Sequence, residues 1–498
     1  MANNRAMVIH PNDSVFIALE DLSAGDVVHV NEQHITLISD VPSGHKVALK
    51  AIPTGEKVMK YGYPIGVALE PIEKGEWIHT HNIKTTLDGP LNYAYTPDEN
   101  RIQAGTTDLT FQGFLRPNGE VGIRNEVWII NTVGCINKTA ESIARLAGDL
   151  YKDRNIDGIY HYPHPFGCSQ LGDDLLYTQK LLGNLVNHPN AGGVLVIGLG
   201  CENNFIESFK ESLGDYKENR VKFIESQWVD DEIADGIDLI GELIGEMEKD
   251  KRQPISLSKL KVGLKCGGSD GFSGITANPL VGEFSNLLIQ NGGTTILTEV
   301  PEMFGAETIL MNRAANERIF SKTVNLINGF KDYFIQHQQP IYENPSPGNK
   351  KGGISTLEEK SLGCVQKGGI GEVVDVIDYG EKVSKQGLNL VQGPGNDLVS
   401  VTALAAAGAH IVLFTTGRGT PFGGPVPTVK ISTNSQIYTK KKNWIDFNAG
   451  ELLENKNMDQ LKQAFFNYVL DIASGNTQTN NEKFGFKEIA IFKTGVTL

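Results

Sequence analysis

The chain of 498 residues has no apolar run as long as the ~18 residues that a membrane-spanning helix needs. At its start, no cationic stretch leads into a short apolar core, so the pattern of a secretory signal is missing. These two absences predict a soluble protein of the cytoplasm with no membrane partner.

Cysteine is scarce. The five cysteines lie far apart, with no C-x-x-C pair, at positions 135, 168, 201, 266 and 364. This spacing argues against a disulfide framework and against a zinc ribbon. Reduced thiols are therefore expected.

Positive charge is in deficit, with 45 Lys and Arg against 59 Asp and Glu and a net charge of -14. Such a balance disfavours a nucleic-acid partner, whose phosphates are uniformly negative. A small anionic substrate is not excluded, because it responds to the local field of a pocket. The nucleotide fingerprints G-x-x-x-x-G-K-[ST] and strand–G-x-G-x-x-G–helix are also missing, which disfavours a nucleotide site.

Glycine, in contrast, is abundant, with 55 of 498 residues against a usual ~7%. Over residues 1–95, Gly and Pro turns separate short β-rich runs such as VFIAL, VVHV and PIGVAL, which predicts a small all-β unit. Residues 96–112 are polar and read as a linker.

After Gly113 the pattern changes to strand–loop–helix units. EVWIINTV leads into GCINKTAESIARLAGDL, GVLVIGLG leads into CENNFIESFKESL, and two further units begin at KLKVGLKC and GLNLVQ. Such alternation predicts α/β architecture with parallel sheets, whose ligands lie outside the carboxyl ends of the strands. The charged stretch EMEKDKRQP suggests a boundary, which gives α/β domains over 113–255 and 256–498.

Several loops between these units are polar and rich in glycine, as in HPFGCSQLGDD, GLGCENN, KCGGSDGFSG, NPSPGNKKGG and TTGRGTPFGG. Clustered backbone N–H groups in such loops bind oxyanions, although glycine clusters also form simple tight turns. The predicted substrate-binding residues are Gln170, Asn203, Ser269, Lys350 and Arg418. Arg418 is suited to bidentate contact with a carboxylate, or to a structural contact with loop carbonyls.

Histidines of the β unit are the predicted metal ligands: His10, His45, His79 and His81. The i, i+2 spacing in WIHTHN would place His79 and His81 on one face of a strand, where they could bind a divalent metal. A surface strand that happens to carry two histidines is the alternative.

Proton transfer is assigned to Lys46, beside His45, and to Asp270 in GGSDG. His161 and His164 in YHYPHPFGC are the next catalytic candidates, or part of a packed loop. Cys135, Cys168 and Cys201 each follow a Gly in a loop after a strand, so they could be soft metal ligands, although a small buried cysteine is the commoner state.

Taken in order, PSGHKVAL, IHTHN, RNEVWIINTVGC, GCSQLGDD, VIGLGCENN, CGGSDGFSGITANP, LTEVPEMFGAE, ENPSPGNKKGGI, FTTGRGTPFGG and WIDFNAG resemble the altronate and galactarate dehydratase family. The resemblance covers the chain from His10 to its end. GCSQLGDD, GLGCENN, EVPEMFGAE and the His pair are closer to the altronate branch. The resemblance implies an N-terminal β-clip domain of the SAF type, conversion of D-altronate to 2-dehydro-3-deoxy-D-gluconate and water, and dependence on Fe2+ or Mn2+.

The candidate residues agree with this chemistry. Dehydration of a sugar acid removes a weakly acidic proton beside a carboxylate and expels hydroxide, so it needs a base, an acid and a Lewis acid. Mn2+ and Fe2+ accept mixed imidazole and oxygen ligands. Because the histidines lie in one unit and the oxyanion loops in the other, the site is expected between the β domain and the large region.

Three alternatives stay open. One is a galactarate or other sugar-acid dehydratase on the same scaffold. Another is an iron–sulfur dehydratase, in which Cys135, Cys168 and Cys201 hold a cluster that binds substrate. The third is a non-catalytic carbohydrate-binding protein. A homo-oligomer is also possible.

Overall fold

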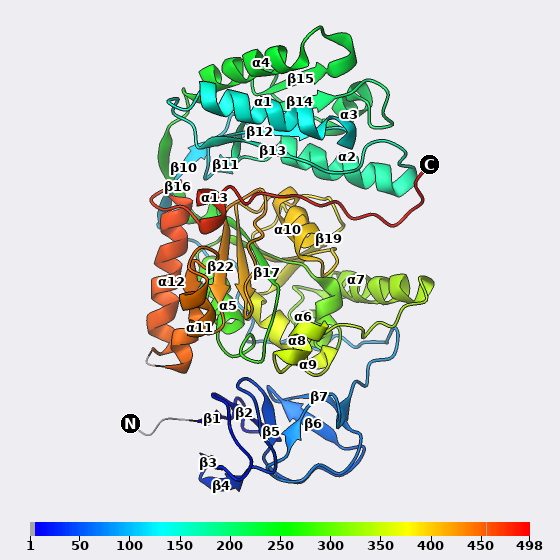
Figure 1. Cartoon of the computed structure of the whole chain (residues 1–498), viewed down its shortest axis with the longest axis vertical. Coiled ribbons are helices and arrows are strands. Elements are labelled where there is room, and N and C mark those ends of the chain that lie inside the picture. The colour runs from blue at the N-terminus through cyan, green and yellow to red at the C-terminus, as the bar shows by residue number, and fades with distance from the viewer. Residues whose placement is uncertain (1–4, 455) are drawn as a thin grey trace.

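The computed structural model describes residues 5–454 and 456–498. Three units follow one another along the long axis, as Figure 1 shows. The N-terminal β domain is at one end, the C-terminal domain is central, and the middle part of the sequence forms the domain at the other end. The predicted fold class, a small all-β unit followed by a large α/β region with parallel sheets, is confirmed.

The N-terminal β domain contains short antiparallel strands in three sheets. The four-stranded sheet has the order β1-β2-β5-β8, and the smaller sheets have the orders β3-β4 and β6-β7-β9. The turn glycines are required by close packing: at Gly75, with φ +87°, an added Cβ would lie 2.1 Å from the Thr36 carbonyl oxygen. The strands are β1 (Ala6–Met7), β2 (Val15–Ala18), β3 (Val27–Val30), β4 (Gln33–Thr36), β5 (Lys46–Ala48), β6 (Lys57–Lys60), β7 (Tyr63–Ala68), β8 (Trp77–Ile78) and β9 (Ile83–Lys84).

The segment after β9 is docked along the C-terminal domain. The Tyr95 hydroxyl donates to the Ala314 carbonyl at 2.6 Å, and the Ile102 amide donates to the Ile370 carbonyl at 2.9 Å. The range 96–112 read as a linker also includes the start of β10 (Thr110–Leu115), which pairs with β11 (Val121–Gly122) and β16 (Arg252–Ser256).

The middle domain is a parallel four-stranded sheet with the order β13-β12-β14-β15. Alternate residues of β12 face opposite sides: Val127 and Ile129 pack with α1 and α4, whereas Trp128 and Ile130 pack with α2, α3 and residues of the C-terminal domain. The elements are β12 (Glu126–Asn131), α1 (Asn137–Leu150), β13 (Gly158–Tyr162), α2 (Gly172–Val186), β14 (Ala191–Gly198), α3 (Ile206–Leu213), β15 (Val221–Glu225) and α4 (Glu232–Met247).

The C-terminal domain has a seven-stranded parallel sheet with the order β19-β20-β18-β17-β21-β22-β23. Its central strands are buried on both faces, as parallel strands covered by helices must be. The strands are β17 (Lys261–Cys266), β18 (Thr294–Leu297), β19 (Val373–Ile377), β20 (Gly387–Val391), β21 (Ile411–Thr416), β22 (Thr428–Ser432) and β23 (Phe447–Asn448). The helices are α5 (Ala277–Gln290), α6 (Glu307–Met311), α7 (Glu317–Gln336), α8 (Pro347–Lys351), α9 (Leu357–Cys364), α10 (Asp397–Ala406), α11 (Ser435–Lys440), α12 (Met458–Ala473) and α13 (Asn480–Lys483).

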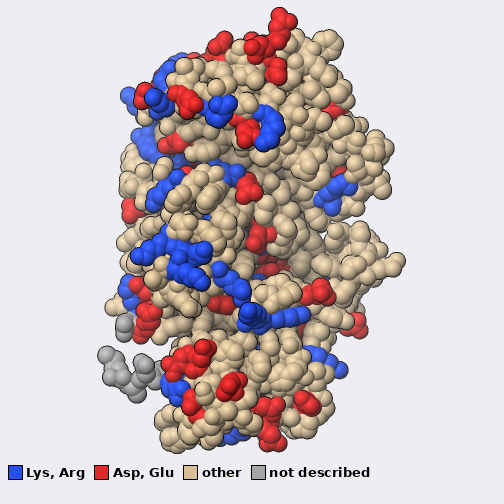
Figure 2. All heavy atoms as spheres, viewed as in Figure 1, with Lys and Arg blue, Asp and Glu red and all other residues tan. Residues whose placement is uncertain are grey.

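Apolar cores join the domains. One cluster contains Ile65 and Ile83 of the N-terminal β domain together with Phe304 and Leu357 of the C-terminal domain. Within the described ranges, no helix is long and apolar enough to cross a bilayer. Figure 2 shows Lys and Arg side chains gathered on the visible face at the level of the C-terminal domain, so the negative net charge does not describe the local surface.

Candidate active site

Polar residues gather where the central strands of the seven-stranded sheet end. Cys266 is the last residue of β17, Glu299 and Glu302 follow β18, and Asp397 follows β20. A pocket of about 530 Å3 opens here, and Lys350 lies among its lining residues. Ligands of parallel sheets bind at this edge, and the volume is suitable for a small ligand.

Lys360 is the central cation of this pocket. Its Nζ lies 2.6 Å from Glu302 Oε2, 3.1 Å from Ser269 Oγ and 3.0 Å from Cys364 Sγ. Burial alone would raise the pKa of Glu302, but Lys360 and two further lysines hold it well below its usual range. The pKa of Lys360 is well above its usual range, against the effect of burial, because thiol and carboxylate groups surround it. The pocket therefore contains a fixed ammonium group, which can hold a carboxylate.

Glu299 lies beneath the same pocket in a left-handed backbone conformation, with φ +68°. Its carboxylate is paired with Lys265, and its Oε2 lies 3.1 Å from Lys367 Nζ. Burial and the neighbouring Cys266 raise the pKa of Glu299 to about 8. Non-glycine residues in this conformation cost about 1–3 kcal/mol and cluster at functional sites.

Three of the predicted substrate-binding residues lie together at this edge. Ser269 contacts Lys360, Lys350 lines the pocket, and the exposed Arg418 donates to the Gly348 carbonyl at 3.3 Å. Asn349 donates to the Ser269 carbonyl at 2.8 Å, which ties α8 to the loop after β17.

A second cluster lies where the N-terminal β domain meets α9. Glu359 accepts from Lys46 at 2.8 Å and from Lys60 at 2.7 Å, and all three side chains are at most 1% exposed. Lys46 also donates to Ser355 Oγ at 2.6 Å and to the Gly353 carbonyl at 2.9 Å. Burial lowers the pKa of Lys46 to about 8, despite the pairing with Glu359. One carboxylate thus lies between two buried ammonium groups, and Lys46 is the one that releases a proton more easily.

Of the four predicted histidine ligands, His45 and His79 lie beside this cluster. His79 Nδ1 is 2.9 Å from Ser355 Oγ, and the ring centroids of His45 and His79 are 5.1 Å apart. His81 is exposed beside Trp77, with ring centroids 5.2 Å apart. His10 contacts Asn12 and Asp13 through hydrogen bonds and packs on Gly62.

The expectation that His79 and His81 share one face of a strand is wrong. Strand β8 ends at Ile78, and the two histidines lie in the turn that follows. The Asn82 side chain accepts from the His79 amide at 3.0 Å, and the Asn82 amide donates to the His79 carbonyl at 3.0 Å. These bonds close a turn in place of an extended strand.

The histidines fit a divalent cation to different degrees. His45 Nδ1 accepts from Trp77 Nε1 at 3.1 Å and its Nε2 lies 3.3 Å from the Lys351 carbonyl, so neither nitrogen offers a free lone pair. Burial and the charge of Lys46 lower the pKa of His79 to about 4, which keeps the ring neutral, as a metal ligand must be. His79 and His81 thus fit an Fe2+ or Mn2+ ligand set better than His45.

Cys266, Glu302 and Cys364 also bring three ligand atoms within 4.8 Å of one another. Lys360 Nζ, however, lies 3.5 Å or less from Cys266 Sγ, Cys364 Sγ and Glu302 Oε2. The Lys360 ammonium group therefore occupies the position that a metal ion would need. In this arrangement Cys266, Glu302 and Cys364 do not fit a metal ion.

Asp270 is buried and its carboxylate is fully engaged. One oxygen accepts from Thr433 at 2.8 Å and Asn434 at 3.2 Å, and the other accepts from Ser273 at 3.1 Å and the Phe272 amide at 3.2 Å. Burial raises its pKa, against these hydrogen bonds. The role shown by these contacts is to hold the loop after β17.

The remaining predicted residues lie in the middle domain. His164 Nε2 is 2.8 Å from the Asn131 carbonyl and its Nδ1 accepts from the Phe166 amide, while His161 is half-buried on β13. Gln170 accepts from the Gly167 amide at 3.0 Å, and Asn203 accepts from the Ser169 amide at 2.7 Å. His164, Gln170 and Asn203 organise loops of the middle domain, and none of the four residues lines the pocket that contains Lys360.

Sequence reasoning missed Glu302 and Lys360, which line the pocket, and the buried charged residues that contact its lining: Lys265, Glu299 and Lys367. For the glutamates a signal was present, because Glu299 and Glu302 come directly after the apolar residues of the strand in TTILTEV, where ligands of parallel sheets bind. Lys360 had no such signal, since it lies on α9 and reaches the sheet edge only through tertiary packing.

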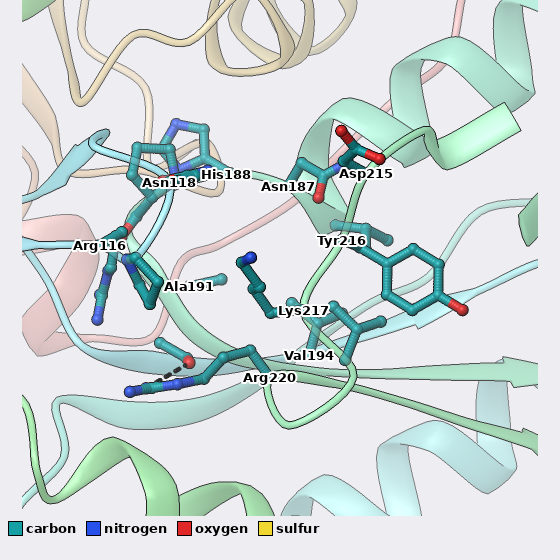
Figure 3. Close-up of a pocket in the computed structure, with 15 residues that line it drawn as sticks. Arg116, Asn118, Asn187, His188, Ala191, Val194, Asp215, Tyr216, Lys217 and Arg220 are labelled. Carbon is teal, nitrogen blue, oxygen red and sulfur yellow. Dashed lines mark hydrogen bonds between the residues drawn. The ribbon is translucent and has the colours of Figure 1, made fainter.

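Figure 3 shows another pocket, in the middle domain, whose lining includes Arg116, Lys217 and Arg220. Its lining includes Ala191 and Val221, at the amino ends of β14 and β15. Arg116 and Arg220 both pair with Asp250, at 2.7 and 2.8 Å. This position, opposite to the carboxyl ends of the strands, disfavours it as the active site.

Comparisons with known proteins match all three domains. Family models match residues 4–86 (altronate/galactarate dehydratase SAF domain), 113–248 (D-galactarate dehydratase/altronate hydrolase, second domain) and 257–497 (D-galactarate/altronate dehydratase, C-terminal). The altronate dehydratases of Bacillus subtilis (strain 168) and Escherichia coli (strain K12) are each 54% identical, over 98% of this chain and 99% of theirs. The galactarate dehydratase (L-threo-forming) of Escherichia coli (strain K12) is 31% identical, over 97% of this chain and 96% of its own. The chain therefore belongs to the altronate/galactarate dehydratase family.

Proposed function

We propose that the protein is a hydro-lyase that converts D-altronate to 2-dehydro-3-deoxy-D-gluconate and water. The observation that carries the proposal is the pocket at the carboxyl edge, with the Lys360 ammonium between Ser269 and Glu302. Identity of 54% over nearly the whole length of two altronate dehydratases supports altronate as substrate in preference to galactarate.

In this proposal, Lys360 and Lys350 bind the substrate carboxylate, and Arg418 closes the rim. The C2–H and C3–O bonds break, a C2–C3 double bond forms, and the resulting enol tautomerises to the 2-oxo product. Fixed ammonium groups stabilise the negative charge that develops as the C2 proton leaves. Lys46, the base expected from the sequence, has its pKa lowered to about 8 but is buried in the second cluster and does not line this pocket, so its contacts do not favour it as the group that takes that proton.

We also propose dependence on Fe2+ or Mn2+, with His79 and His81 as the ligands that fit best and His45 and His10 as weaker candidates. When bound, such an ion supplies Lewis-acid polarisation of the hydroxy acid. Ser355 links His79 to Lys46 and fixes the imidazole ring.

Because the cysteines of the described structure are unpaired, the cytoplasm, where thiols stay reduced, remains the proposed location.

A substrate panel tests the function. The purified protein is supplied with Fe2+ or Mn2+ and assayed for 2-oxo product from D-altronate, galactarate and other sugar acids. We expect the highest kcat/KM with D-altronate and a strong loss in Lys360→Met. A higher kcat/KM with galactarate would overturn the substrate assignment, and full activity of Lys360→Met would overturn the site.

A further inference from the structure

Three cysteines lie at one edge of the middle-domain sheet. Cys135 follows β12, Cys168 follows β13 and Cys201 follows β14, and these strands are neighbours in the order β13-β12-β14. All three are exposed and unpaired, whereas Cys266 and Cys364 are buried. The expectation of small buried cysteines is thus wrong for these three. Free cysteine is normally among the most buried residue types, so three exposed thiols at one sheet edge point to a ligand.

Hydrogen bonds tie the three loops together. The Gly134 amide donates to the Phe166 carbonyl at 2.8 Å, which joins the Cys135 loop to the Cys168 loop. The Asn204 amide donates to the Gly167 carbonyl at 3.0 Å, which joins the Cys201 loop to the Cys168 loop. The three thiols therefore project from one continuous, hydrogen-bonded surface.

The backbone beside Cys168 is built for this arrangement. Gly167 has φ +101° and Ser169 has φ +59°, so both neighbours are in the left-handed region. An added Cβ at Gly167 would lie 2.0 Å from the Thr132 carbonyl oxygen. The glycine is thus required for the close approach of this loop to β12.

The Cys201 loop is fixed by a buried carboxylate. Glu202 accepts from the Leu199, Gly200 and Cys201 amides at 2.7–2.9 Å, and from the Thr132 hydroxyl at 2.6 Å. These bonds leave the Cys201 thiol outside, within 3.7 Å of the Gln227 amide nitrogen. Hydrogen-bond donors near a thiolate are a usual feature of iron–sulfur sites.

We propose that Cys135, Cys168 and Cys201 are the thiolate ligands of a cuboidal iron–sulfur cluster. Three cysteines leave one iron without a thiolate, open to an oxygen ligand such as a carboxylate or hydroxyl group. This site goes beyond the proposed function, because it lies in another domain from the pocket that contains Lys360.

The arrangement of the three thiols does not fit a single tetrahedral ion. A tetrahedral ion with metal–sulfur bonds of about 2.3 Å needs sulfur atoms about 3.8 Å apart. The ligand atoms of Cys266, Glu302 and Cys364 all lie within 4.8 Å of one another, whereas the sulfur atoms of Cys135, Cys168 and Cys201 are not all this close together. A cuboidal cluster holds its thiolates further apart, because each is bound to a different iron atom.

Exposed apolar side chains accompany the thiol-bearing loops. Leu171, three residues after Cys168, is 45% exposed, and Phe205, four residues after Cys201, is 45% exposed. The chain segment 494–498 also reaches these loops, since the Leu498 amide donates to the Ser169 carbonyl at 3.1 Å. An apolar rim limits solvent access to a cluster and tunes its potential.

The test is reconstitution of the full-length protein under anaerobic conditions with Fe3+, sulfide and a thiol, which reduces part of the iron to Fe2+ so that both oxidation states of the cluster are supplied. We expect about four iron and four acid-labile sulfide per chain, broad absorbance in the visible range, and an electron paramagnetic resonance signal after reduction. Cys135→Ser, Cys168→Ser and Cys201→Ser should each lose the sulfide and the absorbance while keeping the circular dichroism spectrum of the parent.

Cys266→Ser and Cys364→Ser are the matched controls, and they should keep the cluster. Iron or zinc without sulfide would overturn the cluster in favour of a single ion. A cluster that survives in the triple variant, or no bound iron and sulfide after reconstitution, would also refute the proposal. Altronate dehydration is assayed separately on the same samples, so failure of the cluster proposal is distinguished from failure of the proposed function.

Discussion

Replacing Glu359 by glutamine removes the carboxylate between the ammonium groups of Lys46 and Lys60. Both nitrogen atoms lie within 2.8 Å of a carboxylate oxygen, and the three side chains are at most 1% exposed. Removing one partner of a buried ion pair leaves an uncompensated charge and costs about 3–5 kcal/mol. Because Glu359→Gln leaves two buried lysines without a carboxylate partner, we expect a loss in the free energy of unfolding at the upper end of that range.

The pH dependence gives a second readout. A buried lysine without a carboxylate partner releases its proton in the folded protein at a lower pH than in the unfolded chain. In that pH range the unfolded chain binds more protons than the folded protein, so the free energy of unfolding rises with pH. Burial already lowers the pKa of Lys46 from its usual 10.5 to about 8 in the parent protein. Without Glu359 the pKa of Lys46 falls further, so its share of the loss should shrink as the pH rises toward about 8, where Lys46 of the parent also becomes neutral. At pH values where Lys46 is charged in both proteins, that share should be fully present.

Urea unfolding at several pH values measures both effects. Lys60→Met in the Glu359→Gln background removes one stranded ammonium and should restore about 2 kcal/mol. Glu358→Gln is the control, because Glu358 accepts from Thr85 and Thr86 and pairs with no lysine among the residues that the structure describes. A midpoint for Glu359→Gln equal to that of the parent, or no recovery in the double variant, would refute the reasoning.

Three further predictions concern activity. Lys360→Met should lower kcat/KM by about 10²–10³-fold with an unchanged circular dichroism spectrum, since it removes a fixed charge from the pocket; a loss below tenfold would contradict this role. Arg418→Lys keeps the charge but not the planar donor pair, so KM should rise, and kcat should fall if the contact tightens in the transition state; unchanged steady-state constants would argue for a structural role. His79→Ala combined with His81→Ala should lower bound Fe2+ and abolish turnover, as metal analysis and activity assays can check, whereas a lower Tm with metal still bound would indicate a role in stability alone.

The sequence predicted the fold well because the strands of the α/β region are apolar runs followed directly by glycine-rich turns and amphipathic helices. The same rule brought Ser269 and Arg418 to one edge, since both follow strands of a single parallel sheet. Lys350 lies in α8, which Asn349 ties to that edge.

Tertiary packing decided the rest. Lys360 could not be placed from the sequence, because its partners Ser269 and Glu302 are 91 and 58 residues away along the chain. The i, i+2 spacing of His79 and His81 was misleading, since Asn82 closes a turn there. The glycine-rich loop favours Asp270 as a site residue, but two of the four donors around its carboxylate come from Thr433 and Asn434, which no local pattern connects to it.

Helix α9 determines which segments must be exchanged together when domains are swapped between relatives. Its consecutive residues Glu358, Glu359 and Lys360 contact the segment after β9, the two lysines of the N-terminal β domain and the pocket, respectively. A β domain grafted from a distant relative therefore brings new partners to a helix that also carries a pocket residue. Chimeras should retain their activity when residues 353–360 are exchanged together with the β domain, and should lose it when the junction separates the two.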